Sequence, residues 1–455
     1  MLRAIWFLVK LGLVAAAAVW LVHQPGEVEI LWRGYLIETS ASFLVLVLAL
    51  LLLLWTVAYR LWRAFIAVPD VYRRYKVSAA REKGYRAVTD GLVAIAAGDG
   101  AAAEKYARRA EYMIPGTPLT KLLTAQTALM QGDAPKARRE FADLLEDDTA
   151  AIFGVRGLLN EALGEGNYRE ALELVRKAEQ LQPKRIWVIR TLLDLETRNG
   201  EWPKAERTLK KAEKLGIVDK DQARQKRQAI WTAMADDNLR LNHIAVATKL
   251  LESAYRLGAG FTPAAVRLAK TYRLADKHRA AFKTIENAWK ANPHPDLAGL
   301  WMGFMPEPKK TKSIYDAGRD TFDWMKRLYD LNPESRDSRR ALGAAALQAR
   351  MWKEARSYLM EADDYRMLAK LERAETSNEA KAREWLEKAA DNPPEPRWCC
   401  AACNHISDDW HGLCPRCGSF ATISWRPPGQ ELQDAPRRVA PLGGGFIAPP
   451  ATINA

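Results

Sequence analysis

Four cysteines near the end of the chain are the residues whose spacing is best suited to chemistry. Cys400, Cys403, Cys414 and Cys417 form two CxxC pairs separated by ten residues. Two residues between paired cysteines allow a tight turn to direct both sulfurs at one ion. We therefore expect these four thiolates to hold a structural Zn²⁺ ion in a zinc-ribbon module over residues 397–426. A closed shell of four thiolates leaves no open position for water or substrate.

Other ligands and another metal remain open at this site. Cys399 adjoins the first pair and could compete for the metal, while His405 and His411 lie between the pairs and could replace a thiolate. Iron in a rubredoxin-like site would use the same four sulfurs. The chain has only five cysteines, all within nineteen positions. This density favours one metal module over a network of disulfides.

No sequence pattern of an enzyme accompanies the cysteines. The chain has no P-loop, no GxSxG elbow and no HExxH, and the triple glycine at 443–445 follows no strand that could support nucleotide binding. Among six histidines, His243, His278 and His294 stand alone, which is typical of surface or packing residues more than of haem ligands. We expect no catalytic residue.

Two apolar segments near the start predict membrane-spanning helices. Residues 4–22 are apolar apart from Lys10, and residues 39–59 carry no charge over 21 positions. The first segment could alternatively be a cleaved secretory signal. Between the spans, apolar and charged residues alternate around Ile30, which predicts a short extended segment.

The basic residues predict the orientation of these spans. Residues 60–86 carry eight Arg and Lys against two acidic residues, whereas the segment between the spans carries only Arg33. Basic residues flank spans on the cytoplasmic side. We therefore expect a multi-pass protein of the bacterial inner membrane, with both termini and the bulk of the chain in the cytoplasm. The reducing cytosol again favours metal over disulfide.

The net charge of +13 does not require a nucleic-acid partner. About half of the excess lies in residues 60–86, next to the anionic lipid headgroups that attract it. The remaining charges are spread among segments rich in both signs, and no nucleic-acid motif accompanies them. A membrane surface explains the charge, and nucleic acid is not favoured as a partner.

The long middle of the chain repeats. Gly98, Gly132, Gly166 and Gly200 recur at a period of 34 residues, the length of a tetratricopeptide repeat. The fifth residue after each glycine is alanine, and the same spacing appears farther along the chain. These alanines are Ala103, Ala137, Ala171, Ala205, Ala281 and Ala355. Small residues recur where helices cross closely, so we predict an all-α solenoid of stacked helical hairpins whose concave surface carries the function.

The repeat pattern weakens in two places. The period slips over residues 216–262, where a longer helical run is expected, and prolines in 292–312 predict an exposed linker or insertion. Pro393, Pro394 and Pro396 end the helical region and predict that the ribbon is set apart from it. The expected organisation is a transmembrane helical hairpin at 1–60, a basic juxtamembrane helix at 61–85, tetratricopeptide-like repeats at 86–391, the ribbon at 397–426 and a disordered tail at 427–455.

The arrangement resembles the HemY family of bacterial inner-membrane proteins linked to haem biosynthesis. The resemblance lies in the two spans, the segment from Gly26 to Ser40 and the repeats, and it covers most of the chain. Alphaproteobacterial members are similar in ending with a cysteine and tryptophan pattern. Here it is matched by Trp398, Cys400, Cys403, Cys414, Cys417, Gly418, Trp425 and Pro428, with Asn404 in place of an expected glycine. The flavin-dependent oxidase that shares the name is excluded, because the chain lacks a dinucleotide fingerprint.

The resemblance implies a noncatalytic scaffold in porphyrin metabolism that holds partner proteins, the late enzymes of protohaem biosynthesis, at the membrane. The ribbon would cap the array or add a docking surface. One alternative is an adaptor similar to lipopolysaccharide assembly protein B, which regulates a membrane protease. A second is direct binding of haem or porphyrin, or redox chemistry at an iron-loaded cysteine site. The predicted extended loop and two spans favour the haem-linked family over the adaptor.

Overall fold

The computed structural model describes residues 26–32, 35–306 and 314–429, with isolated positions before residue 26. The chain forms two compact units, Met1–Ala94 with Ala101–Thr120, and Ile95–Gly100 with Lys121–Ala455. Helices dominate the described residues, and strands form only a two-stranded and a three-stranded sheet. The predicted all-α class is confirmed.

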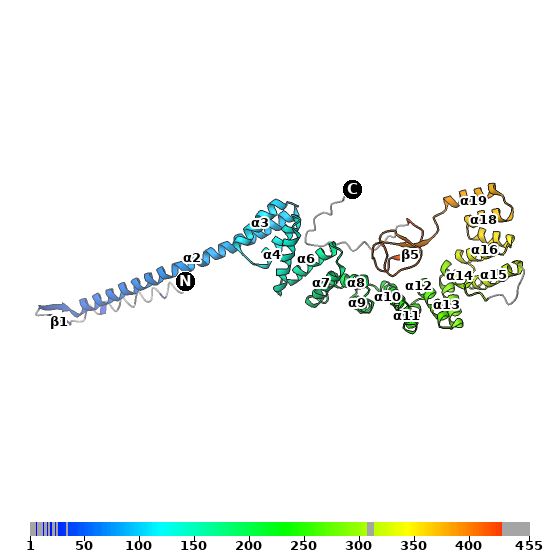
Figure 1. Ribbon diagram of the computed structural model, residues 1–455. Coiled ribbons are helices and arrows are strands. Elements are labelled where there is room, and N and C mark those ends of the chain that lie inside the picture. The colour runs from blue at the N-terminus through cyan, green and yellow to red at the C-terminus, as the bar shows by residue number, and fades with distance from the viewer. Residues whose placement is uncertain are drawn as a thin grey trace. The chain divides into compact units, whose positions relative to one another are not determined.

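The first unit begins with a β-hairpin. Strand β1 (Glu27–Trp32) pairs antiparallel with β2 (Tyr35–Ser40), so the predicted extended segment is present. Helix α2 (Ala41–Ala96) follows the hairpin at once (Figure 1). Its residues Ala41–Arg63 have a mean hydropathy of 2.7, and none of this apolar segment is buried. This is the one segment of the described residues that is long and apolar enough to cross a membrane. The first predicted span, residues 4–22, lies almost entirely outside the described residues.

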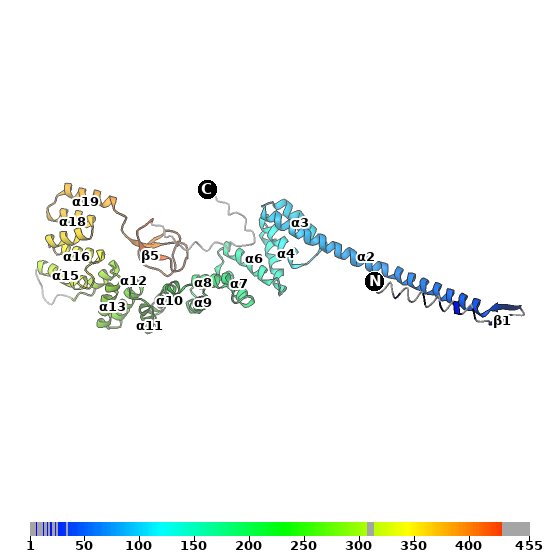
Figure 2. The same cartoon turned by 180° about the vertical axis from the view of Figure 1, so that it is seen from behind.

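After α2 the described chain consists mainly of helices until the last sheet. The main α-helices are α3 (Gly100–Met113), α4 (Pro118–Met130), α5 (Ala134–Asp143), α6 (Ala151–Gly164), α7 (Tyr168–Leu181), α8 (Ile186–Arg198), α9 (Trp202–Lys214), α10 (Lys220–Arg240), α11 (Ile244–Arg256), α12 (Thr262–Leu274), α13 (His278–Ala291), α14 (Pro295–Met302), α15 (Ile314–Tyr329), α16 (Arg336–Gln348), α17 (Trp352–Glu361), α18 (Tyr365–Glu375) and α19 (Glu379–Asp391). Figure 2 shows the helices of the second unit following one another as a solenoid. Each packs mainly on its chain neighbours, as in repeat proteins.

The repeated alanines lie where the helices approach each other. All six alanines at the fifth position after the turn have no exposed surface, which confirms their packing role. A second set seven residues later is at most 1% exposed, namely Ala110, Ala178, Ala212, Ala288 and Ala362. A side chain of one carbon allows the backbones to approach closely, so these positions set the contact between neighbouring hairpins.

The turn within each hairpin requires a left-handed backbone. Gly98, Gly132, Gly166 and Gly200 adopt φ of 72° to 76°, which glycine reaches without steric cost. Farther along the chain the equivalent position, two residues before the second helix, is taken by other residue types. Asn242, Asp276 and Arg350 all have φ of 58° there.

Residues 216–262, the first region where the repeat pattern weakens, therefore contain a regular helical hairpin whose turn lacks glycine. Helix α10 is long, at 21 residues, but the predicted helical run ends at Arg240 and turns at Asn242 into α11. Ala247 occupies the fifth position after the turn and is fully buried. The repeat pattern continues there without its glycine.

The second weak region is not an exposed linker throughout, and that prediction is corrected. Helix α14 lies within 292–312, and its Leu297 and Trp301 are at most 1% exposed. Trp301 stacks on Trp324 of α15 with ring centroids 4.8 Å apart. Each indole donates to the backbone carbonyl of the other tryptophan, at 3.0 and 2.9 Å. Residues 307–313 lie outside the described residues.

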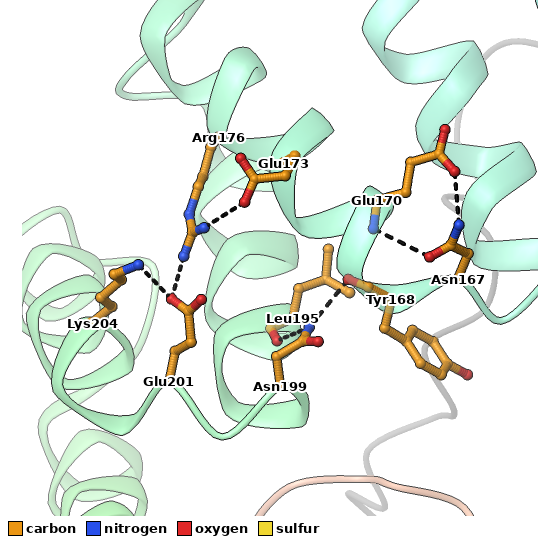
Figure 3. Close-up of polar contacts among 9 residues, drawn as sticks. All are labelled: Asn167, Tyr168, Glu170, Glu173, Arg176, Leu195, Asn199, Glu201 and Lys204. Atoms are coloured by element: carbon orange, nitrogen blue, oxygen red, sulfur yellow. Dashed lines mark hydrogen bonds and ion pairs between the residues drawn. The ribbon is translucent and has the colours of Figure 1, made fainter.

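Polar contacts join successive repeats on the side of the turns (Figure 3). Arg176 of α7 pairs with Glu201 at the start of α9, and Lys204 reaches the same carboxylate at 2.8 Å. Asn199 donates to the backbone carbonyl of Tyr168 at 3.1 Å, across 31 residues of sequence. These bonds connect successive hairpins, while buried alanines and larger aliphatic side chains together form the packed core between them.

Candidate metal centre

The cysteines lie in a small antiparallel sheet after the last helix. Strand β3 (Arg397–Cys400) is central, with β4 (Ile406–Ser407) on one side and β5 (Ile423–Arg426) on the other. The pairing places Cys400 opposite Ile423 and Cys399 opposite Ser424. We call this sheet and its loops, residues 397–426, the ribbon.

Two tight turns direct the sulfurs of the CxxC pairs toward one point. In the first turn the Asn404 backbone N–H donates to the Cys400 carbonyl at 2.9 Å, and Asn404 has φ of 54°. In the second, the Gly418 backbone N–H donates to the Cys414 carbonyl at 2.8 Å, and Gly418 has φ of 67°. Asparagine tolerates this conformation better than most side chains, which explains its substitution for the expected glycine.

The four predicted sulfurs come together. All four Sγ atoms lie within 4.8 Å of one another, with 3.7 Å between Cys400 and Cys417 and 3.7 Å between Cys403 and Cys414. A tetrahedral ion with bonds of about 2.3 Å to sulfur has edges of about 3.8 Å between sulfurs. The donor set therefore fits a four-coordinate metal ion. Thiolate geometry of this kind suits zinc and iron alike.

The electrostatics of the cluster also fit a cation. Burial raises the pKa of the Cys403 thiol to about 12 and raises that of Cys414. Burial opposes ionisation of Cys417 as well, but hydrogen bonding with Ser419 lowers its pKa to about 6. A bound cation would supply the positive charge that the Cys403 and Cys414 thiols need in order to ionise.

The alternative ligands do not reach the cluster. Cys399 points to the other side of the sheet, where its buried Sγ donates to the Arg426 carbonyl at 3.6 Å. Among the described residues, the close group of potential metal ligands contains the four CxxC cysteines alone, without His405 or His411. His411 instead lies beside the solenoid, along a groove described below.

The ribbon is not set apart from the solenoid, and that prediction is wrong. It packs against helices α8, α10, α12 and α14, the first helix of four successive hairpins, and its Phe420 ring lies 5.8 Å from the Trp202 ring at the start of α9, measured between centroids. Strand β5 lies beside α10 and α12 in Figures 1 and 2. The segment between α19 and β3, which was expected to separate the ribbon, is itself bound to the solenoid, because Arg340 of α16 donates to Glu395 at 2.8 Å. We call the surface of these four helices that contacts the ribbon the inner face. It comprises Arg198, Ala229, Ala233, Phe261, Arg267 and Asp296.

At one end of the inner face, the second cysteine turn rests on α8 and α10. Arg198 donates to the Cys417 backbone carbonyl at 2.9 Å and lies over the Tyr168 ring at 4.3 Å. Gly412 approaches α10 so closely that a Cβ atom there would meet the Ala233 Cβ at 3.2 Å. Polar and apolar contacts therefore both fix the metal loop to the helices.

At the other end, three tryptophans of the ribbon meet α12 and α14. Arg267 donates to the Trp410 carbonyl at 2.9 Å and to Asp236 at 2.7 Å. The Trp398 indole donates to the Asp296 carboxylate at 3.2 Å. Beside it, the His294 ring lies 5.1 Å from Trp398 and 4.4 Å from Trp425, measured between ring centroids.

His294 is a packing residue, as its isolation in the sequence predicted. It is 3% exposed, and its Nδ1 accepts from the Asp296 backbone N–H at 3.1 Å, which caps α14. Burial lowers the pKa of its imidazole, and the nearby Asp296 carboxylate opposes that shift. No local pattern indicates that this histidine lies against the ribbon. The only available signal was the density of tryptophans around the cysteines, which exceeds what so small a sheet can bury by itself.

Two grooves follow the seam between ribbon and solenoid. One, of about 810 Å³, lies between α10, α12, α14 and the loop around Trp410. Its charged side chains are of both signs, with Arg240, Lys270 and Arg267 facing Asp236, Asp296 and Asp409. The other, of about 390 Å³, lies near Arg340 and Trp425. The ribbon itself covers the middle of the inner face.

Comparison with known proteins gives one family match. Residues 26–148 match the family model described as HemY protein N-terminus, which spans the β-hairpin, α2 and the first repeats. A curated relative, named a probable magnetosome protein Mms48 of Magnetospirillum gryphiswaldense, is 23% identical over 457 residues and covers 93% of each chain.

The chain is also similar to solved structures. One is pilF of Pseudomonas aeruginosa, with 15% identity, 49% of this chain and 98% of that chain covered, and a TM-score of 0.27. Another is a tetratricopeptide repeat protein of Thermus thermophilus, with 21% identity, 41% and 98% coverage and a TM-score of 0.23. The repeat assignment of the present chain depends on its own hairpins, turns and buried alanines.

Proposed function

We propose that this HemY-like tetratricopeptide-repeat protein is a noncatalytic scaffold, anchored in the bacterial inner membrane, that holds partner proteins of late protohaem biosynthesis. The observation that carries the proposal is the HemY N-terminal match over residues 26–148, joined to a solenoid of helical hairpins. Solenoids present long surfaces to other proteins. Confining enzymes that pass on a poorly soluble porphyrin raises their effective concentration for one another.

The membrane anchor in this proposal has two spans. The proposed span at residues 39–59 overlaps the apolar segment Ala41–Arg63 of α2 and begins two residues before it. Residues 4–22 would form the other span. The excess of basic residues over positions 60–86 supports a cytoplasmic position for the repeats, next to the inner leaflet. The anchor would then be residues 1–60, followed by a juxtamembrane segment at 61–85 and the scaffold at 86–391. The metal module would be residues 397–426, and the tail residues 427–455.

The metal in this proposal is a structural Zn²⁺ ion held by Cys400, Cys403, Cys414 and Cys417. The fit of the four sulfurs to a tetrahedral shell supports it. A closed four-thiolate shell stabilises a fold and supplies no activated water. Zinc would therefore contribute the shape of the ribbon, while the helices contribute the surfaces that bind partners.

Affinity capture tests the scaffold role. The full chain, tagged and solubilised in detergent after mild crosslinking in the cell, should retain late enzymes of protohaem biosynthesis, identified by mass spectrometry. A matched control carries only residues 1–86, which keeps the anchor and lacks the solenoid. Absence of every such enzyme from the full-length capture, or equal recovery with the control, would contradict the proposal.

A second candidate function is an adaptor similar to lipopolysaccharide assembly protein B. It is favoured by one observation, the combination of an apolar helix, helical repeats and a cysteine cluster in one chain. Its partner would be a membrane protease. The same capture experiment separates the two roles, because the adaptor would retain the protease and not the haem enzymes.

A further inference from the structure

The ribbon links repeats that do not otherwise touch. In a solenoid each hairpin contacts only its neighbours, so stability is transmitted from one repeat to the next. Here the ribbon bonds to α8 through Arg198, to α12 through Arg267 and to α14 through Asp296. These three side chains span almost one hundred residues of the chain, and one small module connects them all.

The ribbon residues that make these contacts lie close to the cysteines in sequence. Arg198 binds the carbonyl of Cys417 itself, and Gly412, which meets α10, lies two residues before Cys414. Trp398, which reaches Asp296, lies two residues before Cys400. The positions of these groups are therefore set by the turns that hold the metal.

The ribbon has little else to hold its shape. Its strands have four, two and four residues. Its apolar cluster joins Trp398, Trp410 and Ile423 to Ala229, which belongs to α10. Modules of this size depend on a bound metal to fold. Without the metal, the groups that contact the inner face lose their fixed spacing together.

We propose that the inner face is a binding site for the chain's own ribbon, and that metal binding at the four cysteines controls whether it is covered. With metal bound, the ribbon docks and joins α8 to α14 into one cooperative unit. Loss of the metal releases the ribbon and exposes an apolar strip, including Ala229 and Ala233, between Arg198 and Arg267. This inference depends on the metal site of the proposed function, which the experiment below measures separately.

Hydrogen exchange on the full-length protein in detergent micelles tests the inference. Exchange of backbone amides would be followed by mass spectrometry with the metal bound and after chelation, and bound metal would be counted in the same samples. We expect amides of α8, α10 and α12 to exchange more than about tenfold faster after chelation. Helices α5 and α6, which do not touch the ribbon, should be unchanged.

Two substitutions separate docking from metal binding. In Gly412→Leu the new side chain meets Ala233 on α10, while the backbone at Gly412 needs no left-handed conformation, so the ribbon should keep its metal and lose its docking. Arg416→Leu, at an exposed position of the same ribbon, is the control. Arg198→Ala removes the bond to the Cys417 carbonyl, and Arg190→Ala, on the same helix, is its control.

The possible results are distinct. The inference is supported if Gly412→Leu retains stoichiometric metal yet shows fast exchange in α10 and α12, as the chelated wild type does, while Arg416→Leu does not. It is overturned if the wild type binds metal but chelation leaves exchange in α8, α10 and α12 unchanged. A wild-type protein that binds no metal would overturn the metal site as well.

Discussion

The four cysteines of the ribbon share one ion, so each of them should be indispensable for binding it. In Cys417→Ser a weakly acidic hydroxyl replaces the thiol whose pKa is lowered to about 6. We expect loss of stoichiometric metal and of an ordered ribbon, because structural zinc contributes on the order of 10 kcal/mol to the folding of such modules. Metal analysis and the absorption of the cobalt-substituted protein measure this directly.

Cys399 provides the matched control, since it is buried and adjacent but points away from the cluster. Cys399→Ser should keep one metal ion per chain and the thiolate-to-cobalt absorption. Equal loss of metal from both variants would show that the four-sulfur assignment is wrong.

His294 should make the seam between ribbon and α14 sensitive to acid. Burial lowers the pKa of its imidazole below the usual value of about 6.5, and Asp296 is the charged group that faces it. The folded chain therefore binds this proton less readily than the unfolded chain does. Its stabilisation is complete above the unfolded pKa and is lost as the pH falls below about 6.5. We expect α14 to exchange faster at pH 5.5 than at pH 7.5, after correction for the intrinsic rate.

The variant His294→Asn isolates this effect. Asparagine can still accept the hydrogen bond that caps α14, but it does not titrate. The variant should lose the pH dependence, even though it also loses the ring contacts with Trp398 and Trp425. An unchanged pH dependence would assign the titration to another group.

At the scale of elements, the hairpins are held by close contacts that tolerate no added atom. Gly157 of α6 lies against the Phe141 ring of α5, where a Cβ atom would come within 2.4 Å of the ring. Phe141 is 1% exposed and cannot move aside. Overpacking of this kind costs about 1–3 kcal/mol, which exceeds the gain of about 1 kcal/mol from placing alanine in a helix. Gly157→Ala should therefore lower the free energy of unfolding.

Gly164, at the end of the same helix, has nothing within 4 Å of such a Cβ atom. Gly164→Ala should leave stability unchanged or raise it by up to about 1 kcal/mol. Urea denaturation of the two variants gives the comparison. If both raise stability equally, the contact between α5 and α6 is looser than described.

The recurrence of glycine and alanine in the sequence predicted the helical hairpins well wherever glycine marks the turn. The reason is physical, because the hairpin needs a left-handed residue at its turn and small residues where its helices meet. The prediction failed at Asn242, where a non-glycine residue adopts the same left-handed turn. It failed again at α14, because the prolines around this helix predict a break, whereas Pro295 is the first residue of the helix, a favoured position for proline.

At the scale of the whole molecule, the metal ligands were predictable and their surroundings were not. The CxxC spacing is local, so it identifies the four sulfurs without knowledge of the fold. The contacts of Arg198 with Cys417 and of Arg267 with Trp410 join residues 219 and 143 positions apart. No local pattern encodes such pairs, and the local pattern that is present, Pro393, Pro394 and Pro396, predicts a separate ribbon instead.

The docked ribbon changes how the solenoid can serve as a scaffold. A concave surface with its centre covered offers partners the seam grooves and the helices before α8, instead of one continuous channel. Partners that bind the inner face itself would compete with the ribbon. In the proposed haem-linked role, the ribbon would therefore divide the surface that the membrane-anchored solenoid offers to partners.

The most direct test of this role is the porphyrin profile of cells depleted of the protein. We predict that late porphyrin intermediates accumulate and protohaem falls, and that the full-length chain restores both whereas residues 1–86 alone do not. An unchanged profile, in cells where depletion is verified, would contradict the account.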